Sequence, residues 1–432
     1  MSFTSSSTVG SSAAASPRWS DLYISALARA ASNCGDMLAA TALALILQGR
    51  GEGGLAVAGI MLAAALPLMV VGPFAGRLAD RVDSRKLLIT VGVAQVAVCV
   101  ALAFTRQPAL IIGLVAMLAI GLSITSPTMN ALTPLMVGRD NLAKASGISQ
   151  TASTIGMLLA PALGGVLVGA FGARIPLLID AGTYLAIPIA GLLIRTRRGG
   201  KFRAAAAAAA ANGEAGAVPA PTTFRLRSDG LMWPLFVLIG AVIAAISAVD
   251  VVDVFFVRET LHSTPWMYGV VGATWLGGMV IGAVFAGRQR RDDVGTARVL
   301  LMFALATSVT IGVAGLVPHV AWLIPLWLIG GVLNAFGNVG IGVILGSRVA
   351  PEVRGHAGAI FNSIASGANA TGFLLGGALL AVAAPRTLIV GCGLAGLAVT
   401  AIFAPPLVRA IRREQTLAVS ANEPEPAVQV AA

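Results

Sequence analysis

Five ionisable side chains lie inside long apolar stretches of this 432-residue chain, where they could bind a proton or a charged ligand. They are Arg29, Asp36, Asp180, Asp250 and Asp253. A charged group at membrane depth costs on the order of 3 kcal/mol, so each of these residues needs a physical reason to be there.

The first apolar stretch holds the pair most suited to proton chemistry. Arg29 and Asp36 are seven residues apart, which places them on one face of a helix, roughly 10 Å apart along its axis. Asp36 should lie near the middle of the membrane. A buried carboxyl with a basic neighbour can load and unload a proton, so we expect Asp36 and Arg29 to carry proton coupling. A static polar contact within or between helices is the alternative.

The other three acids have less specific surroundings. Asp250 could line a central cavity and attract a cation, or lie at the membrane interface near Arg258, and the sequence does not separate these two readings. For Asp253 we favour the interface. Asp180 follows the loop that holds Arg174, so we expect a structural role for it.

Histidines and cysteines offer no catalytic or metal-binding pattern. His262, His319 and His356 are scattered in loops or at the ends of apolar stretches, without the spacing of a metal site or of a nucleophile and its base. Cys34, Cys99 and Cys392 lie inside apolar stretches and resemble small buried apolar residues. We therefore expect no enzyme activity, no metal and no cofactor.

Composition indicates whether water or lipid surrounds most of the chain. Apolar residues make up 57% of the sequence, charged residues only 11%, and the mean hydropathy is +0.88. A soluble domain carries about 25% charged residues. The net charge of +11 does not indicate nucleic-acid binding, because no basic run is interleaved with aromatic residues on a soluble module. The chain is predicted to be an integral membrane protein in contact with the lipid bilayer.

Twelve apolar segments approach or exceed the roughly 20 residues that a membrane-spanning helix needs. They predict an all-α membrane protein with helices over 21–47, 55–75, 87–104, 109–137, 145–170, 175–194, 231–257, 266–286, 297–317, 320–345, 357–383 and 387–408.

Basic residues are divided unequally between the two sets of connecting loops. The amino-terminal side and every second loop hold 23 of the 29, and the opposite loops hold five: Arg50, Arg106, Arg174, Arg258 and Arg386. Under the positive-inside rule this asymmetry predicts that both termini are cytoplasmic.

An internal repeat divides the chain into two halves. The letters FAGR at 74–77 recur at 285–288, and LGGVLV at 163–168 is echoed by LGGALL at 375–380. We expect a disordered tail over 1–20, six-helix halves over 21–194 and 231–408, a cytoplasmic linker over 195–230 and a cytoplasmic tail over 409–432.

The loop after the second span carries a family resemblance. Residues 74–88 hold four basic and two acidic side chains, and Gly76, Asp80, Arg81 and Arg85 fit the loop signature of the major facilitator superfamily. Asp83 stands where that signature has glycine, which puts a tight turn there in question. The resemblance is to the twelve-span, proton-driven exporters and implies their fold of two pseudo-symmetric six-helix halves.

The same resemblance implies a role for this loop. In the family it stabilises the outward-facing state, so Asp80 is expected to face the amino end of the eleventh helix around residues 355–357. Backbone N–H groups and the helix dipole favour an anion there. The alternative is that the charges only anchor the topology.

Two further segments extend the resemblance. The stretch 156–165 resembles the family's antiporter motif through Gly156, Pro161, Gly164 and Gly165, although small residues also pack helices in every polytopic protein. The stretch 29–36 resembles the first span of drug and siderophore exporters. In the tenth span, Asn334 and Asn338 could donate hydrogen bonds into a cavity or join helices, and we favour the second.

Taken with the acids, the resemblance implies a proton-coupled exporter of a small amphipathic organic molecule, such as a drug, a macrolide-like compound or a siderophore. A passive facilitator or importer, or a non-transporting receptor, is the alternative. We expect a monomer in the plasma membrane, whose partners are its substrate, protons and lipid.

Overall fold

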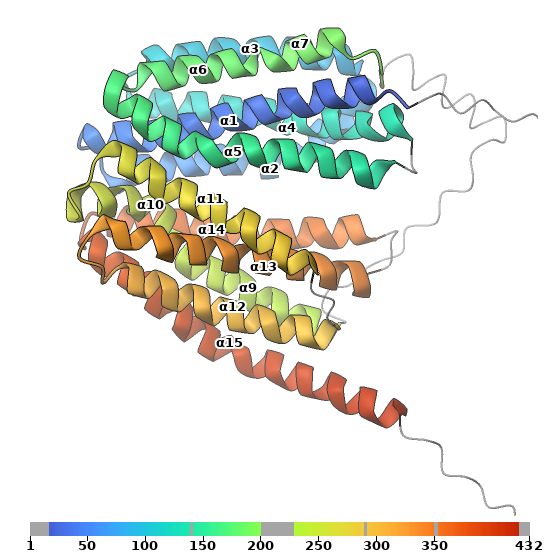
Figure 1. The fold of residues 1–432 in the computed structure, drawn as a ribbon, viewed down its shortest axis with the longest axis vertical. Coiled ribbons are helices and arrows are strands. Elements are labelled where there is room, and N and C mark those ends of the chain that lie inside the picture. The colour runs from blue at the N-terminus through green and yellow to red at the C-terminus, as the bar shows by residue number, and fades with distance from the viewer. Residues whose placement is uncertain (1–16, 139–140, 200–228, 289–291, 350–352, 423–432) are drawn as a thin grey trace, which may run out of the picture.

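The structure, a computed structural model, describes residues 17–138, 141–199, 229–288, 292–349 and 353–422. Figure 1 shows two helical halves, the first coloured blue to green and the second yellow to red. The first half contains α1 (Trp19–Gly49), α2 (Gly54–Arg81), α3 (Ser84–Phe104), α4 (Pro108–Val137), α5 (Leu142–Phe171), α6 (Arg174–Tyr184) and α7 (Ala186–Leu193). In this half α6 and α7 together make the sixth crossing.

In the second half, several crossings are built from more than one element. It contains α9 (Met232–Ile246), α10 (Ala248–Phe255), a π-helix η3 (Phe256–Thr260), α11 (Pro265–Arg288), α12 (Asp293–Ala314), a 3₁₀ turn η4 (Val320–Trp322), α13 (Leu323–Arg348), α14 (Arg354–Leu379) and α15 (Pro385–Asn422). The described residues form no strand.

The number of crossings agrees with the sequence. Eleven of the described helical segments are long and apolar enough to span a membrane. The twelfth crossing is α14, which has 26 residues but is interrupted by polar side chains such as Asn362 and Asn369. The prediction of an all-α protein with twelve spans is confirmed.

The chain ends differ from the expected boundaries. Helix α1 begins at Trp19, two residues before the expected start. Helix α15 continues to Asn422, so the segment from 409 onward, expected as a tail, is helical for its first fourteen residues. Arginine, glutamate and glutamine in this stretch are good helix formers, which explains the extension. The alanine run at 204–211 lies outside the described residues.

Arg348 ties this extension to the second half. Its guanidinium lies 2.8 Å from Asp293, 2.9 Å from Glu414 and 3.3 Å from Asp229. The three acids come from α12, α15 and the segment before α9, while Arg348 ends α13. One side chain thus joins four parts of the chain at the end of the bundle where the termini lie.

Equivalent aspartates begin the helices of the two halves. Asp83 caps α3 by accepting a hydrogen bond from the backbone N–H of Arg85 at 2.8 Å, and Asp292 caps α12 through Gly295 at 3.0 Å. The backbone of Asp83 has a φ of −59°, a value open to any residue. Glycine is therefore not needed at this position, and aspartate is favourable there as a helix N-cap.

The halves meet at the end opposite the termini (Figure 1). A Cβ added to Gly269 of α11 would overlap the carbonyl oxygen of Pro161 in α5. Near the start of α2, a Cβ on Gly54 would lie 2.5 Å from the side chain of Leu380 beyond α14. Gln48 completes the contact by donating to Glu259 at 3.1 Å and accepting from Arg258 at 3.4 Å.

Candidate functional site

Asp36 lies in a polar cluster between α1, α3 and α6. The hydroxyl of Tyr184 donates a hydrogen bond to the Asp36 carboxylate at 2.6 Å. Tyr184 itself is 1% exposed, and Asp36 is partly buried. The described residues include no basic side chain in an ion pair with Asp36. The partner of this carboxylate is therefore a neutral hydroxyl.

Asp180 is the second acid of the cluster. It is 1% exposed, accepts a hydrogen bond from the thiol of Cys99 in α3 at 3.4 Å, and accepts another from Thr183 at 3.3 Å. Its Oδ1 atom would overlap a Cβ on Gly35, the residue that precedes Asp36 in α1. We expected a structural role for Asp180, and the structure brings it into the surroundings of Asp36.

Helix spacing and one glycine explain how the cluster forms. Asp180, Thr183 and Tyr184 are at positions i, i+3 and i+4 of α6 and its end, so they share one face. Gly35 stands opposite them in α1, and a Cβ there would overlap Thr183 and Asp180. The missing side chain allows α6 to bring its polar face against α1.

Arg29 has different neighbours from Asp36. Its guanidinium donates to the side-chain oxygen of Asn130 in α4 at 2.8 Å, and Asn130 is exposed. Thus Arg29 contacts α4, whereas Asp36 contacts α6. The sequence placed the two residues on one face of α1, and their hydrogen bonds connect that helix to two different neighbours.

Asp250 and Asp253 lie on α10 in unlike environments. Asp253 is 9% exposed, and its Oδ1 atom has no hydrogen-bond partner among the described residues. Asp250 is exposed. The described bonds of Arg258 go to Gln48 and to the carbonyl oxygen of Ser263, not to either acid.

The two asparagines of α13 bond to one another. The side-chain N–H of Asn338 donates to the oxygen of Asn334 at 2.8 Å. Asn338 is exposed and Asn334 partly buried. This contact is within one helix, so it does not itself join α13 to a neighbour.

The glycines and proline of the motif in α5 make close helix contacts. A Cβ on Gly156 would overlap the carbonyl oxygen of Ala30 in α1, and one on Gly164 would lie 3.2 Å from Thr41. A Cβ on Gly165 would lie 2.6 Å from the carbonyl oxygen of Pro265 in α11. The motif therefore packs α5 against α1 in its own half and, together with Pro161, against α11 in the other half.

The charged loop is only partly described. Arg81 is exposed and Arg85 is partly buried. Asp83 lies 3.9 Å from Arg197, and the backbone N–H of Ser84 donates to the carbonyl oxygen of Arg198. These contacts hold the loop to the end of the first half. The side chains of Asp80 and His356 lie outside the described part, so the expected contact between Asp80 and the start of α14 stays a prediction.

Sequence reasoning missed two of these partners. Asn130 lies in a long, mostly apolar helix, and no sequence pattern ties it to Arg29. Tyr184 could have been found, because its spacing of four residues from Asp180 places both on one helix face. Within the described ranges, no group of three His, Cys, Asp or Glu side chains could hold a metal ion.

Comparison with known families covers nearly the whole chain. Residues 16–432 match the family described as transmembrane secretion effectors. The chain is 28% identical over 135 residues to macrolide efflux protein A of Enterococcus faecalis, a match that covers 30% of this chain and 42% of that protein. It is 25% identical over 336 residues to the enterobactin exporter EntS of Citrobacter koseri, with 71% of each chain covered.

Solved structures share the fold. A POT family transporter in complex with 5-aminolevulinic acid has a TM-score of 0.72 at 11% identity, over 91% of this chain and 97% of that one. A peptide transporter POT in complex with sulfate has a TM-score of 0.69 at 17% identity, over 92% and 95%. At these identities the likeness supports the twelve-helix architecture alone.

Proposed function

We propose that this chain, which belongs to the transmembrane secretion effector family of the major facilitator superfamily, is a proton-coupled exporter. Its substrate is a small amphipathic organic molecule of the macrolide or siderophore class. Alternating access between the two halves moves the substrate across the plasma membrane, and both termini are cytoplasmic. The efflux function named for its relatives supports the direction of transport.

The pairing of partly buried Asp36 with buried Asp180 is the observation that supports proton coupling. Two carboxylates in one site repel each other when both are charged, and neither is in an ion pair within the described part of the chain. Protonation of one carboxylate removes this repulsion, so the pair is expected to hold a proton. Because the cluster joins α1 to α3 and α6, a change in its charge acts on the packing of α1.

The state of the molecule supports the same cycle. The halves are packed together at the end opposite the termini, where glycines bring α5 against α11 and α2 against the end of α14. With cytoplasmic termini, this arrangement closes the outer side and corresponds to an inward-facing state. In that state an exporter accepts its substrate from the cytoplasm.

Substrate contacts are assigned to exposed polar groups inside the spans. Polar residues at membrane depth face the interior of the bundle or a water-filled cavity. Asn130, Asp250 and Asn338 are exposed inside the spans, and the partly buried Arg29 donates a hydrogen bond to Asn130. We propose that these four side chains line the path of the substrate.

Transport in reconstituted vesicles tests this function. Purified protein in proteoliposomes should accumulate a radiolabelled macrolide or enterobactin only when a proton gradient of the correct sign is imposed. Equilibration without accumulation would indicate a passive facilitator, and no flux for any compound would indicate a receptor. A growth-inhibition panel comparing cells with and without the protein should choose the compounds.

A further inference from the structure

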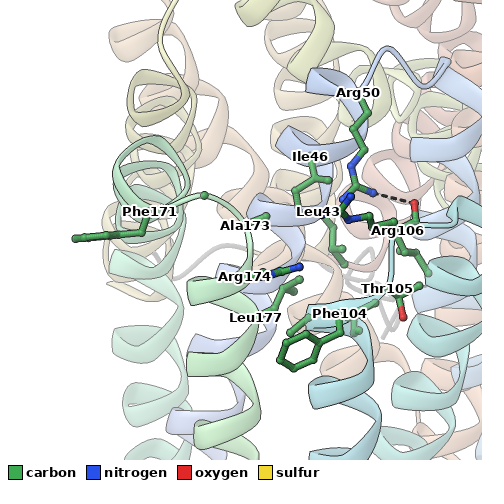
Figure 2. Close-up of a pocket in the computed structure, with 14 residues that line it drawn as sticks. Leu43, Ile46, Arg50, Phe104, Thr105, Arg106, Phe171, Ala173, Arg174 and Leu177 are labelled. Carbon is green, nitrogen blue, oxygen red and sulfur yellow. Dashed lines mark hydrogen bonds between the residues drawn. The ribbon is translucent and has the colours of Figure 1, made fainter.

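Three arginines converge on one pocket at the end of the first half opposite the termini. The pocket has a volume of about 340 Å³, and Arg50, Arg106 and Arg174 line it together with apolar side chains. Figure 2 shows the three side chains reaching toward the same space from the end of α1, the loop after α3 and the start of α6. All three are exposed.

This gathering of cations has no described counter-charge. Arg50 donates to the backbone carbonyl of Arg106 at 2.9 Å, and Arg174 lies 5.6 Å from the ring centroid of Phe104. No carboxylate lines the pocket, and no described acid forms an ion pair with any of the three. Like charges in one place repel, and an anion among them would remove that repulsion.

The basic residues at this end of the molecule are concentrated in this pocket. Only five of the chain's 29 basic residues lie in the loops at this end, and three of them line this single pocket. The other two, Arg258 and Arg386, lie outside the lining of this pocket and donate to Gln48 and to the carbonyl oxygen of Gly315. Guanidinium groups bind phosphate through paired hydrogen bonds, which makes them suited to a phosphate-bearing anion.

The walls of the pocket indicate where that phosphate comes from. Buried Leu43, Leu102, Ile111 and Leu177 form the apolar lining. Large apolar side chains continue from the pocket along the outside of α3 and α6, where Phe104 is 59% exposed and Ile179 41% exposed. The site thus lies at the helix ends, at headgroup level, above a surface suited to acyl chains.

We propose that this pocket binds the phosphate of an anionic phospholipid, with the headgroup among the three arginines and the acyl chains along α3 and α6. The inference concerns α1, α3 and α6 at the end of the bundle, and it does not depend on proton coupling or on the substrate.

Binding of phosphatidylglycerol to the purified full-length protein tests the proposal. We expect native mass spectrometry to show phosphatidylglycerol bound in preference to phosphatidylcholine. The R50Q/R106Q/R174Q variant should lose at least tenfold in affinity for phosphatidylglycerol. The matched control is R386Q, which removes an arginine at the same end of the other half and should bind as the unaltered chain does.

The single variant R106Q keeps the test valid if the triple variant does not fold. No described protein group accepts a hydrogen bond from the side chain of Arg106, so R106Q removes charge without breaking an internal contact, and it should weaken phosphatidylglycerol binding severalfold. Unchanged binding in both variants would overturn the proposal. Glycerol phosphate is the soluble probe, and if it competed at the same concentration as the lipid, the lipid assignment would be wrong.

Discussion

At the scale of single residues, Asp36 combines membrane depth with an uncharged partner. Its carboxylate accepts a hydrogen bond from Tyr184 and lies near a second acid, Asp180. A proton that drives export must favour opposite-facing states when bound and when released, because a ligand shifts an equilibrium only through differential affinity. The charge of this cluster is the quantity that would differ between the two states.

We expect Asp36→Asn to abolish accumulation against a gradient and to remove the pH dependence of transport. Asparagine keeps the volume of the side chain and mimics the neutral form, so exchange of substrate down its own gradient should persist. Flux in proteoliposomes at several pH values measures both. Asp36→Glu is the control and should retain part of the activity. Uphill pumping by Asp36→Asn with unchanged pH dependence would move the proton site elsewhere, and Asp250 would be tested next.

Arg348 is expected to contribute to stability. Arg348→Gln leaves Asp229, Asp293 and Glu414 clustered without a cation, and its loss from this partly exposed network should cost about 2 kcal/mol, between the values for exposed and for buried ion pairs. Thermal unfolding in detergent should show a clear fall in Tm.

Arg354→Gln is the matched control for Arg348→Gln. Arg354 donates only to the backbone carbonyl groups of Gly346 and Val349 in the described structure and is exposed. Its loss should lower Tm by less than half as much. Equal effects would show that the acids around Arg348 do not matter.

The sequence located these residues unevenly. The sequence indicates Asp36 as a candidate proton site because this residue lies deep in an apolar stretch. The cost of burying a charge can be judged from that stretch alone. Its contact with Tyr184 was not predicted, since it joins residues 148 positions apart. That pairing depends on Gly35 allowing α6 to approach α1, and no pattern in either helix alone shows it.

At the scale of elements, α5 and α11 form the most extensive contact between the halves in the described structure. Pro161 and Gly269 are so near that an added methyl group has no room. We expect Gly269→Ala to destabilise this contact by about 2 kcal/mol, an overpacking cost that corresponds to a shift of roughly 30-fold in an equilibrium. The end opposite the termini should then open more often.

Spin labels at Gln107 and Leu316, one in each half at that end, would report the opening as a longer distance. Gly277→Ala in the same helix is the matched control, because its Cβ would lie 3.8 Å from Leu158, an ordinary contact. The control should leave the distance distribution unchanged. A Gly269→Ala distribution identical to that of the control would show that this contact does not hold the end closed.

The charged loop after α2 supports a separate prediction. Asp80→Asn should preserve insertion and expression but lower the transport rate, since it removes an anion proposed to meet a helix amino end, an interaction of up to ~2 kcal/mol. Transport assays normalised to the amount of protein in the membrane measure this. Normal rates would reduce the loop to a topological anchor.

The elements themselves were largely predictable. A bilayer requires long helices with internally satisfied backbone groups, so apolar length marked the twelve spans. What the sequence did not show were the division between α6 and α7 at Leu185, the π-helix at Phe256–Thr260 and the extension of α15 to Asn422. These depend on packing or on contacts such as that of Arg348 with Glu414.

At the scale of the whole molecule, the arrangement of basic residues predicts the orientation. A single cysteine at Thr416 should react only with membrane-permeant reagents in intact cells, and one at Gln107 should also react with impermeant reagents. Both positions are exposed. The native Cys34, Cys99 and Cys392 are buried or partly buried and would be replaced first. Labelling of Thr416→Cys by an impermeant reagent would reverse the assigned topology.

The contact between the halves has a consequence for how the molecule responds to its solvent. It is made by glycines packed against backbone and against apolar side chains such as Leu380, and by one neutral amide, Gln48, bonded to Arg258 and Glu259. Short-range packing of this kind is not screened by salt, whereas exposed charge pairs are. The strength of this contact should therefore change little between low and high ionic strength, and side-chain volume at the contact should control it instead.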